Sequence, residues 1–264
     1  MESYSGKNVV VTGAAHGIGT AFARYFAERG SWLVLVDIDG DALEKVGRTL
    51  PQQGREHLCL VKDLSVHTER QSLFDTLQAQ NIDVDVLVNN AGIGYWSNLV
   101  DTPWERIEKV IDLNVKGTTH MVWLFLPQML KRDRGIIINL SSTGAFCGAN
   151  KAAAYTGTKA YVSNFTEAVD MEVYHTGVRT LTAHPGATDT NFWKANGTDQ
   201  SAMYQKLKLM SSEETVADFM NALHQKKKSI IAGRRNRMMV SASRFIPRET
   251  LKRMAIRKYA DVTA

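Results

Sequence analysis

The stretch KNVVVTGAAHGIG, residues 7–19, decides the fold. Its apolar, β-branched start is typical of a buried strand, and it runs directly into a turn that holds Gly13, Gly17 and Gly19. Glycine permits a tight turn and a close approach of the backbone to a phosphate, and the helix that follows supplies N–H donors and a positive dipole end. The stretch predicts a strand, a phosphate-binding turn and a helix, although an ordinary strand-to-helix junction also uses glycine.

The rest of the chain repeats this alternation of a short apolar run and a helical segment. Strands are expected at 7–12, 32–37, 57–61, 84–89, 135–142, 178–184 and 229–233, and helices at 18–29, 41–50, 67–80, 104–112, 118–132, 152–175 and 213–225. Strands that are apolar almost throughout are covered on both faces, and strand–helix alternation is typical of parallel βαβ units. The sequence therefore predicts one α/β domain over residues 1–232, with a doubly wound parallel sheet of about seven strands.

Composition narrows the class of protein. The 264 residues are 44% hydrophobic, but no run of 18 apolar residues occurs, so no membrane-spanning helix is expected. The start of the chain lacks the pattern of a secretory signal. Two cysteines provide no disulfide framework and the seven histidines are scattered, so we expect no metal site and a cytoplasmic location.

The net charge of +5 is unevenly distributed. Residues 226–264 carry 12 Lys and Arg against two acidic residues, a net charge of +10, which leaves −5 for the other 225 residues. Within the C-terminal extension, residues 233–264, apolar residues alternate with arginines and then follow Pro247. The pattern predicts two short basic amphipathic helices that lie on an anionic membrane surface, on a partner subunit or near a substrate mouth. We expect no nucleic-acid binding, because aromatic residues are few there.

Asp37 ends the second predicted strand, 24 residues after Gly13. A carboxylate at that place accepts hydrogen bonds from the 2′-hydroxyl of an adenosine ribose and repels a 2′-phosphate. No basic residue flanks Asp37, and His16 rather than Arg or Lys precedes Gly17. These features favour NAD over NADP, while a simple N-cap of the next helix is the alternative role for Asp37.

The segment YTGTK, residues 155–159, places Tyr155 and Lys159 four positions apart on one face of a predicted helix. A phenol has a pKa near 10, too high for an efficient base at neutral pH. A neighbouring ammonium stabilises the phenolate and lowers that pKa. The pair is therefore either a surface contact or a general acid/base device.

Further short motifs stand at the ends of predicted strands or on the helices that follow them. They are TGxxxGxG from Thr12, Asp63, NNAG from Asn89, Asn114, Ser142, YxxxK from Tyr155 and PG from Pro185. In this order and at these spacings, the set closely resembles the short-chain dehydrogenase/reductase family, over residues 7 to about 232. The resemblance implies a Rossmann-type sheet, a nicotinamide cofactor and hydride transfer at an alcohol or ketone carbon.

The resemblance also implies catalytic roles. Tyr155 is the expected general acid/base, and Lys159 tunes it and holds the ribose of the nicotinamide. Ser142, 13 residues before Tyr155, is expected to bond the substrate oxygen. Its neighbour Ser141 faces the other side of a strand, since side chains alternate. Asn114 resembles the asparagine that anchors a proton-relay water, with a solvent-facing helix residue as the alternative.

The expected cofactor-binding positions follow from the same resemblance. Asp63 resembles the residue that bonds the adenine amino group, unless it merely caps a helix, and Thr190 is expected to reach the diphosphate. The turn at Pro185 resembles the one that contacts the nicotinamide carboxamide. The full predicted set is Gly13, His16, Gly17, Ile18, Gly19, Asp37, Asp63, Leu64, Asn90, Ala91, Gly92, Tyr155, Lys159, Pro185, Gly186, Thr188 and Thr190.

The substrate is expected beyond the carboxyl ends of the strands. The loops predicted there hold Tyr95, Trp96, Phe146, Cys147, Gly148, Phe192, Trp193, Met203, Tyr204 and Met210. Aromatic and methionine side chains suit a bulky hydrophobic ketone or secondary alcohol, although they also pack a lid against the body. Cys147 is expected in a pocket wall.

Two other functions compete with this prediction. One is a non-catalytic NAD-binding module that signals to a partner, which the intact Ser142–Tyr155–Lys159 set disfavours. The other is an NADPH-dependent ketoreductase, which Asp37 disfavours. Family members pair through the helices at 104–132 and 152–175, so a homodimer or homotetramer is expected.

Overall fold

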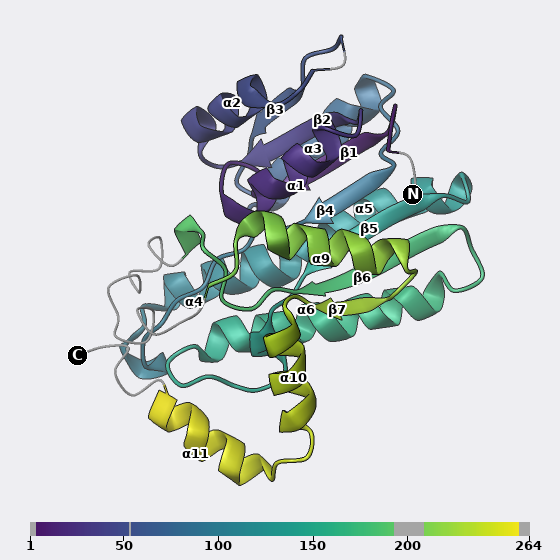
Figure 1. Cartoon of the computed structure of the whole chain (residues 1–264). Helices are drawn as coiled ribbons and strands as arrows, with labels where there is room; N and C mark the ends of the chain where they lie inside the picture. Colours follow the sequence, from purple (N-terminus) through teal and green to yellow (C-terminus); the bar gives the residue numbers. More distant parts are fainter. Residues whose placement is uncertain (1–3, 53, 193–208, 259–264) are drawn as a thin grey trace.

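A computed structural model describes residues 4–52, 54–192 and 209–258 (Figure 1). Seven parallel strands form one sheet in the order β3-β2-β1-β4-β5-β6-β7. The strands are β1 (Asn8–Thr12), β2 (Trp32–Asp37), β3 (Leu58–Val61), β4 (Val86–Asn89), β5 (Gly135–Leu140), β6 (Val178–His184) and β7 (Ser229–Ile231). The predicted α/β doubly wound sheet is therefore confirmed.

Helices cover both faces of this sheet (Figure 1). The described helices are α1 (Gly17–Ala27), α2 (Gly40–Thr49), α3 (His67–Ala79), η1 (Leu99–Asp101), α4 (Trp104–Ile111), η2 (Asp112–Gly117), α5 (Thr118–Lys131), η3 (Thr143–Ala145), α6 (Ala153–Glu172), α9 (Ser212–His224), α10 (Arg234–Ser243) and α11 (Arg248–Lys258). None of them combines the length and apolar composition that crossing a bilayer requires.

Two apolar cores separate the sheet from the two helical layers. Within β1, Val9 and Val11 point to the core that contains Phe22 of α1 and Phe219 of α9. Val10 points to the opposite core, which α3, α5 and α6 complete. This alternation explains why three successive residues of the strand, Val9, Val10 and Val11, are all apolar: both faces of the strand are buried.

The chain reverses the direction of strand addition between β1 and β4, which are neighbours in the sheet. In open α/β sheets, a crevice forms outside the carboxyl ends of the strands at such a switch point. The first glycine turn lies on one side of this crevice, and the loops after β4, β5 and β6 lie on the other.

Most predicted boundaries differ from the observed ones by one to three residues, and two of the differences bear on the site. The fifth strand ends at Leu140 and not at residue 142, because Ser142 leaves the sheet to cap the short helix η3. The helices expected at 104–112 and 118–132 form one continuous run, since the π-helical segment η2 joins α4 to α5. π-Helical turns are rare and often occur at functional sites, and η2 carries Asn114.

Candidate active site

A cleft of about 1550 Å³ lies at the carboxyl ends of the strands. It extends from Asp37 and Asp63 at one end, past the glycine turn, to Ser142 and Tyr155. Beyond Tyr155, the cleft continues to the C-terminal helices α10 and α11, which supply part of its wall. The structure thus gathers residues from both ends of the sequence around one cavity.

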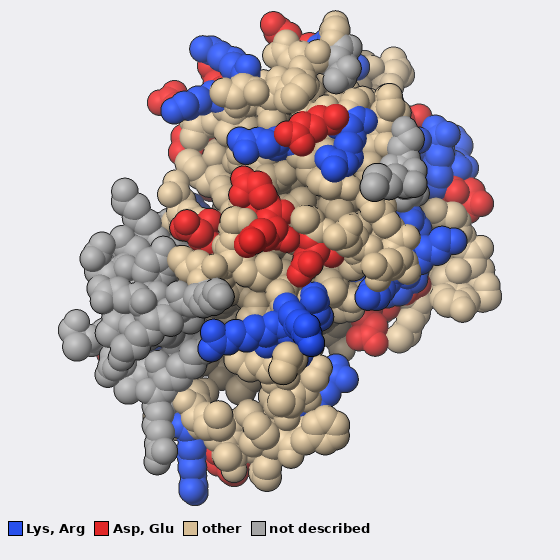
Figure 2. All heavy atoms as spheres, viewed as in Figure 1, with Lys and Arg blue, Asp and Glu red and all other residues tan. Residues whose placement is uncertain are grey.

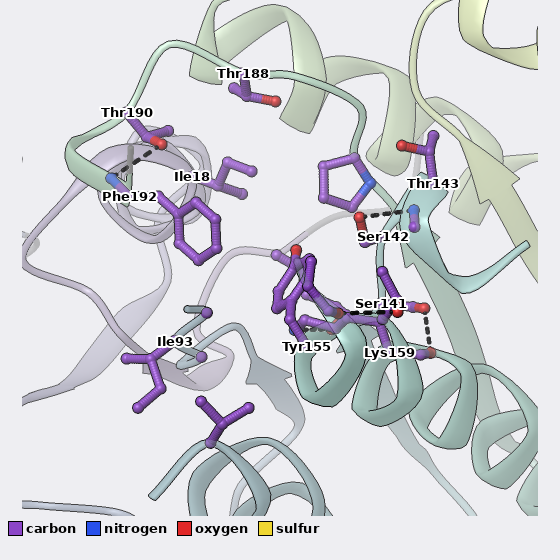
Figure 3. A pocket seen from close by; sticks show the side chains of 18 of the residues that line it. Ile18, Ile93, Ser141, Ser142, Thr143, Tyr155, Lys159, Thr188, Thr190 and Phe192 are labelled. Carbon is purple, nitrogen blue, oxygen red and sulfur yellow. Dashed lines mark hydrogen bonds between the residues drawn. The ribbon is translucent and has the colours of Figure 1, made fainter. Parts of the chain in front are cut away.

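Tyr155 and Lys159 occupy one face of α6, as their spacing predicts (Figure 3). Lys159 is only 6% exposed, its ammonium donates a hydrogen bond to the Leu140 carbonyl at 2.9 Å, and its Nζ lies 5.9 Å from the centre of the Tyr155 ring. Burial lowers the pKa of Lys159 from 10.5 to about 8, because desolvation penalises the charged form. The pair is therefore an internal arrangement and not a surface contact.

Ser142 follows β5 and lines the cleft near Tyr155 (Figure 3). Its Oγ accepts a hydrogen bond from the Gly144 N–H at 3.0 Å. A Cβ on Gly144 would lie 3.4 Å from that Oγ and 3.8 Å from the Tyr155 ring, so the serine and the tyrosine border the same glycine. The neighbouring Ser141 instead donates from its hydroxyl to the Lys159 carbonyl at 2.7 Å and ties α6 to the end of β5.

Asn114 is buried in η2, so the alternative of a solvent-facing helix residue is wrong. Its Oδ1 accepts from the Ile93 N–H at 3.0 Å, and its Nδ2 donates to the Ile93 carbonyl at 2.8 Å and to the Thr158 hydroxyl at 3.0 Å. A Cβ on Gly92 would lie 3.2 Å from Asn114 Oδ1 and 3.1 Å from Lys159 Nζ. The Asn114 and Lys159 side chains therefore both lie next to Gly92.

The glycine turn has the backbone that its sequence predicts. Gly13 and Gly17 have φ values of +63° and +52°, which other residues rarely adopt. Asn90 holds the turn by donating from Nδ2 to the carbonyls of Thr12 and Gly13, at 2.9 and 3.0 Å. Helix α1 begins with no side-chain cap and no acidic residue in its first turn, which leaves its dipole end suited to an anion.

Asp37 lies at the carboxyl end of β2 with its carboxylate fixed by two backbone donors. The Ala15 N–H donates to one oxygen at 3.0 Å and the Asp39 N–H to the other at 3.1 Å. Asp39, and not Asp37, caps α2, so the N-cap alternative for Asp37 is wrong. His16 pairs with Asp39 at 2.9 Å and stands beside this end of the cleft.

Asp63 likewise lines the cleft without capping α3, which begins after Val66. It accepts from the backbone N–H and the hydroxyl of Ser65, at 2.9 and 2.6 Å, and Lys109 lies 3.5 Å away. Burial by itself would raise the pKa of Asp63, but these hydrogen bonds and the Lys109 charge outweigh burial and lower the pKa. The carboxylate is therefore ionised at neutral pH.

Most of the other predicted cofactor positions also line the cleft: Ile18, Leu64, Asn90, Ala91, Gly92, Pro185, Gly186, Thr188 and Thr190. Gly17, Gly19 and Asn114 do not themselves line the cleft but lie next to residues that do, namely Thr190, Asn90 and Ile93. A Cβ on Gly17 would clash with the Thr190 side chain at 2.5 Å, and one on Gly19 would come within 2.7 Å of Asn90 Nδ2. The cleft has carboxylates at one end, a series of backbone turns along its wall and the N-terminus of α1 beside it. These features together fit a dinucleotide.

Aromatic rings surround Tyr155 on the side away from α6. Trp96 and Phe192 lie 5.2 and 5.6 Å from the Tyr155 ring, centre to centre, and 5.7 Å from each other. Gly94 leaves room for this cluster, because a Cβ there would lie 2.7 Å from Trp96 and 3.1 Å from Phe192. Tyr95, Phe146, Cys147 and Gly148 also line the cleft, whereas Met210 packs against the first core. Trp193, Met203 and Tyr204 lie outside the described residues.

The sequence prediction missed one residue of the site, His184, and left the place of another part open. His184 is buried beneath it, with Nδ1 3.2 Å from the Ser142 carbonyl oxygen, Nε2 3.2 Å from the Ser229 hydroxyl and its ring against Phe146. Burial and the Lys159 charge lower the pKa of His184 to about 4, although its hydrogen bond to Ser142 opposes them. The position of His184 at the end of a predicted strand, just before Pro185, is the feature of the sequence that could have identified it. The part left open is the wall formed by α10 and α11, for which a place near the substrate mouth was one of three alternatives.

This combination of a switch-point cleft, a dinucleotide-sized groove and a buried lysine beside a tyrosine defines an oxidoreductase of the CH–OH class. The chain belongs to the short-chain dehydrogenase family: residues 7–201 match the family described as "short chain dehydrogenase". The resemblance seen in the motifs is thus confirmed at the level of the family.

Relatives and solved structures agree with this assignment. The chain is 32% identical over 199 residues to an uncharacterized oxidoreductase of Staphylococcus epidermidis, which covers 75% of this chain and 84% of that protein. Oxidoreductase UcpA of Salmonella typhimurium is 32% identical over 191 residues, 72% of each chain. A short-chain dehydrogenase/reductase from Burkholderia phymatum in complex with NAD is similar with a TM-score of 0.81 and 26% identity, over 91% of this chain and 94% of that one. One from Sphingobium yanoikuyae in complex with NADPH has a TM-score of 0.78 and 27% identity, over 85% and 87%.

Proposed function

We propose that this enzyme uses NAD to interconvert a secondary alcohol and a ketone on a bulky hydrophobic substrate. The observation that carries the proposal is the grouping of Ser142, Tyr155 and Lys159 in one cleft whose far end holds Asp37. The cleft joins a proton-transfer group to a site for a ribose. A non-catalytic NAD-binding module has no need of the serine and the tyrosine beside a buried lysine.

In the proposed mechanism, the Tyr155 hydroxyl exchanges a proton with the substrate oxygen, and the Ser142 hydroxyl orients that oxygen. When bound, nicotinamide supplies the acceptor or the donor of the hydride. During oxidation, the alcohol proton passes to the deprotonated Tyr155 as hydride leaves the carbinol carbon, and during reduction Tyr155 returns that proton. The Lys159 ammonium, held by the Leu140 carbonyl, stabilises the phenolate across a poorly hydrated space. Asn114 is proposed to anchor a relay water near Lys159.

NAD is proposed over NADP because the carboxylates of Asp37 and Asp39 line the end of the cleft where we expect the adenosine ribose, and they would repel a 2′-phosphate. Asp37 is fixed in direction by the N–H groups of Ala15 and Asp39, and the Asp39 carboxylate stands two residues away. Lys62, which follows β3 and lines the cleft, forms an ion pair with Glu69 at 3.0 Å. Among the solved relatives one holds NAD and another NADPH, so the choice is argued from this chain's own residues.

The hydrophobic substrate is proposed from the wall around Tyr155. Trp96, Phe146 and Phe192 line the cleft there, and the C-terminal helices add Met239 and Leu251. One similar solved structure, with a TM-score of 0.78 and 25% identity over 90% of this chain and 92% of that one, is of a 7β-hydroxysteroid dehydrogenase. We therefore propose a steroid-like, acyl-chain or natural-product carbonyl compound.

The test is turnover followed by nicotinamide absorbance, with NAD(H) and NADP(H) against a panel of hydrophobic ketones and secondary alcohols. Tyr155→Phe should lower kcat by a factor of about a hundred or more, the usual contribution of a general acid/base. Tyr161→Phe is the matched control, because Tyr161 lies on the same helix and its hydroxyl contacts Thr119 at 3.0 Å, away from the cleft. Full activity in Tyr155→Phe would refute the mechanism, and NADH binding without turnover of any compound would favour the sensor function.

We also propose a homodimer or homotetramer that forms through α5 and α6. Trp123 on α5 is 67% exposed and Met171 on α6 is 67% exposed, which is unusual for side chains of this size. Light scattering on Trp123→Glu, expected to yield a smaller species, tests this interface. A cytoplasmic location remains our proposal, with Cys59 and Cys147 as free thiols.

A further inference from the structure

Helices α10 and α11 form a surface that is attached to the body mainly through the start of α10. Arg237 donates to Asp218 at 3.2 Å and to the Ile231 carbonyl at 3.0 Å, and Val240 is buried. In Figure 1 the two helices lie beyond β7, and α11 extends away from the sheet. They therefore form an appendage at the edge of the domain.

One side of this appendage belongs to the cleft. Met239 and Val240 of α10 and Leu251, Met254 and Ala255 of α11 line the same cavity as Tyr155. The residues of α11 follow an i, i+3, i+4 pattern, which places them on one face of the helix. An apolar molecule that enters the cleft at this end must pass these side chains.

The other side of the appendage exposes large apolar side chains to solvent. Phe245, between the two helices, is 88% exposed, and Met238 and Ile256 are more than half exposed. Figure 2 shows mostly uncharged surface over this part of the molecule, with a hollow between the two helices. Exposed side chains of this kind in one place mark a contact surface.

The charge around these apolar side chains is positive. Arg234, Arg235, Arg244, Arg248, Lys252 and Arg253 are all exposed there. The only acidic residue between positions 234 and 258 is Glu249, which pairs with Lys252. Because the chain outside residues 226–264 has a net charge of −5, an anionic surface attracts this end and repels the rest, which fixes the orientation.

We propose that α10 and α11 dock the enzyme on an anionic phospholipid bilayer, beside the end of the cleft that they line. Exposed apolar side chains enter the interface while arginines and lysines bind the headgroups, as in other interfacial helices. The cytoplasmic leaflet has the required negative charge. The delivery of a hydrophobic substrate from the bilayer rests on the proposed function, whereas the docking itself does not.

The experiment is sedimentation of the full-length protein with vesicles of phosphatidylcholine alone and of phosphatidylcholine mixed with phosphatidylglycerol. Binding is expected only with the mixed vesicles, and added salt should weaken it. Arg248→Glu/Arg253→Glu should lower the partition coefficient by about thirtyfold or more, since each basic residue contributes about fivefold. Phe245→Ser should lower it by roughly tenfold through lost apolar burial. None of the three altered residues lines the cleft.

The matched control is Lys45→Glu/Lys131→Glu, which makes the same charge change at two exposed residues far from the appendage in sequence. It should retain binding to the mixed vesicles, and thermal unfolding should show that all variants fold. Absence of wild-type protein from the pellet of mixed vesicles overturns the proposal, as does an equal loss of binding in the control. If Phe245→Ser changes the oligomeric state and leaves vesicle binding intact, the surface is a subunit interface and the proposal fails. Because sedimentation requires no turnover, it tests membrane docking even if the enzyme does not catalyse the proposed reaction.

Discussion

The buried position of Lys159 predicts that replacing it changes how stability depends on pH. In the protein without cofactor, burial lowers the pKa of this ammonium from 10.5 to about 8. Holding the charge near pH 7 then costs about 3 kcal/mol of folding free energy, at 1.36 kcal/mol for each pH unit between the two values. Lys159→Met has a similar length and no charge, so it removes this cost.

The sign follows from proton binding. Between about pH 8 and 10.5 the unfolded chain holds the Lys159 proton and the folded chain does not, so this residue makes stability rise with pH in that window. Between pH 7 and pH 9, the free energy of unfolding of the wild type should therefore increase by about 1.3 kcal/mol relative to that of Lys159→Met. The variant also loses the hydrogen bond to the Leu140 carbonyl. This loss changes the difference in unfolding free energy between the two proteins at pH 7 more than it changes how that difference depends on pH.

The assay is urea unfolding of both proteins at the two pH values, without cofactor. Lys45→Met is the control, because Lys45 is exposed on α2 and should give a difference that does not change with pH. A constant difference between wild type and Lys159→Met, equal to that of the control, would refute the reasoning. It would mean that water or a local rearrangement hydrates the ammonium in solution.

Three further predictions concern other parts of the site. Asp37→Ser should raise the ratio of kcat/KM for NADP to that for NAD by about a hundredfold, because it removes a carboxylate that repels a 2′-phosphate; an unchanged ratio in steady-state assays would place cofactor choice elsewhere. Gly94→Ala should lower kcat/KM for bulky ketones by about tenfold and leave the Kd for NADH unchanged, because the new methyl group displaces the Trp96 and Phe192 rings; fluorescence titration with NADH separates the two effects. His184 has a pKa of about 4 when folded and 6.5 when unfolded, so wild-type stability should fall as the pH drops through that window by up to about 3 kcal/mol. His184→Gln should show a flatter acid limb in thermal unfolding, and equal slopes would contradict the assigned pKa.

The parts of the fold that the sequence predicts well depend on local patterns. Continuous apolar runs such as the one in β1 predict strands buried on both faces, and the structure confirms all seven within a few residues. Glycines with positive φ explain why the turn after β1 could be placed from residue types alone. In contrast, the end of β5 was missed, since the bond from Gly144 N–H to the Ser142 hydroxyl competes with strand pairing and no periodicity records it.

The roles of polar residues in the site were harder to predict, because they depend on partners distant in the sequence. Asn114 looks like any polar helix residue until Ile93 and Thr158 are brought against it. His184 is equally inconspicuous, since its partners Ser142 and Ser229 lie 42 and 45 residues away. The amphipathic pattern of the extension predicted two helices but left open what their apolar sides contact. The structure places one side on the cleft.

The same burial that destabilises Lys159 makes it effective. A hydrated ammonium acts weakly on a phenol, because water screens the charge, whereas the interaction grows as the local dielectric falls. The fold achieves this by enclosing the ammonium beneath Gly92 and against the end of β5, where Ser141 fixes the backbone of α6 and the Leu140 carbonyl fixes Nζ. A negative charge on Tyr155 relieves part of the desolvation cost of Lys159, so deprotonation of the tyrosine and protonation of the lysine favour each other. The free energy that the resting protein loses by burying this lysine therefore returns as stabilisation of the phenolate during proton transfer.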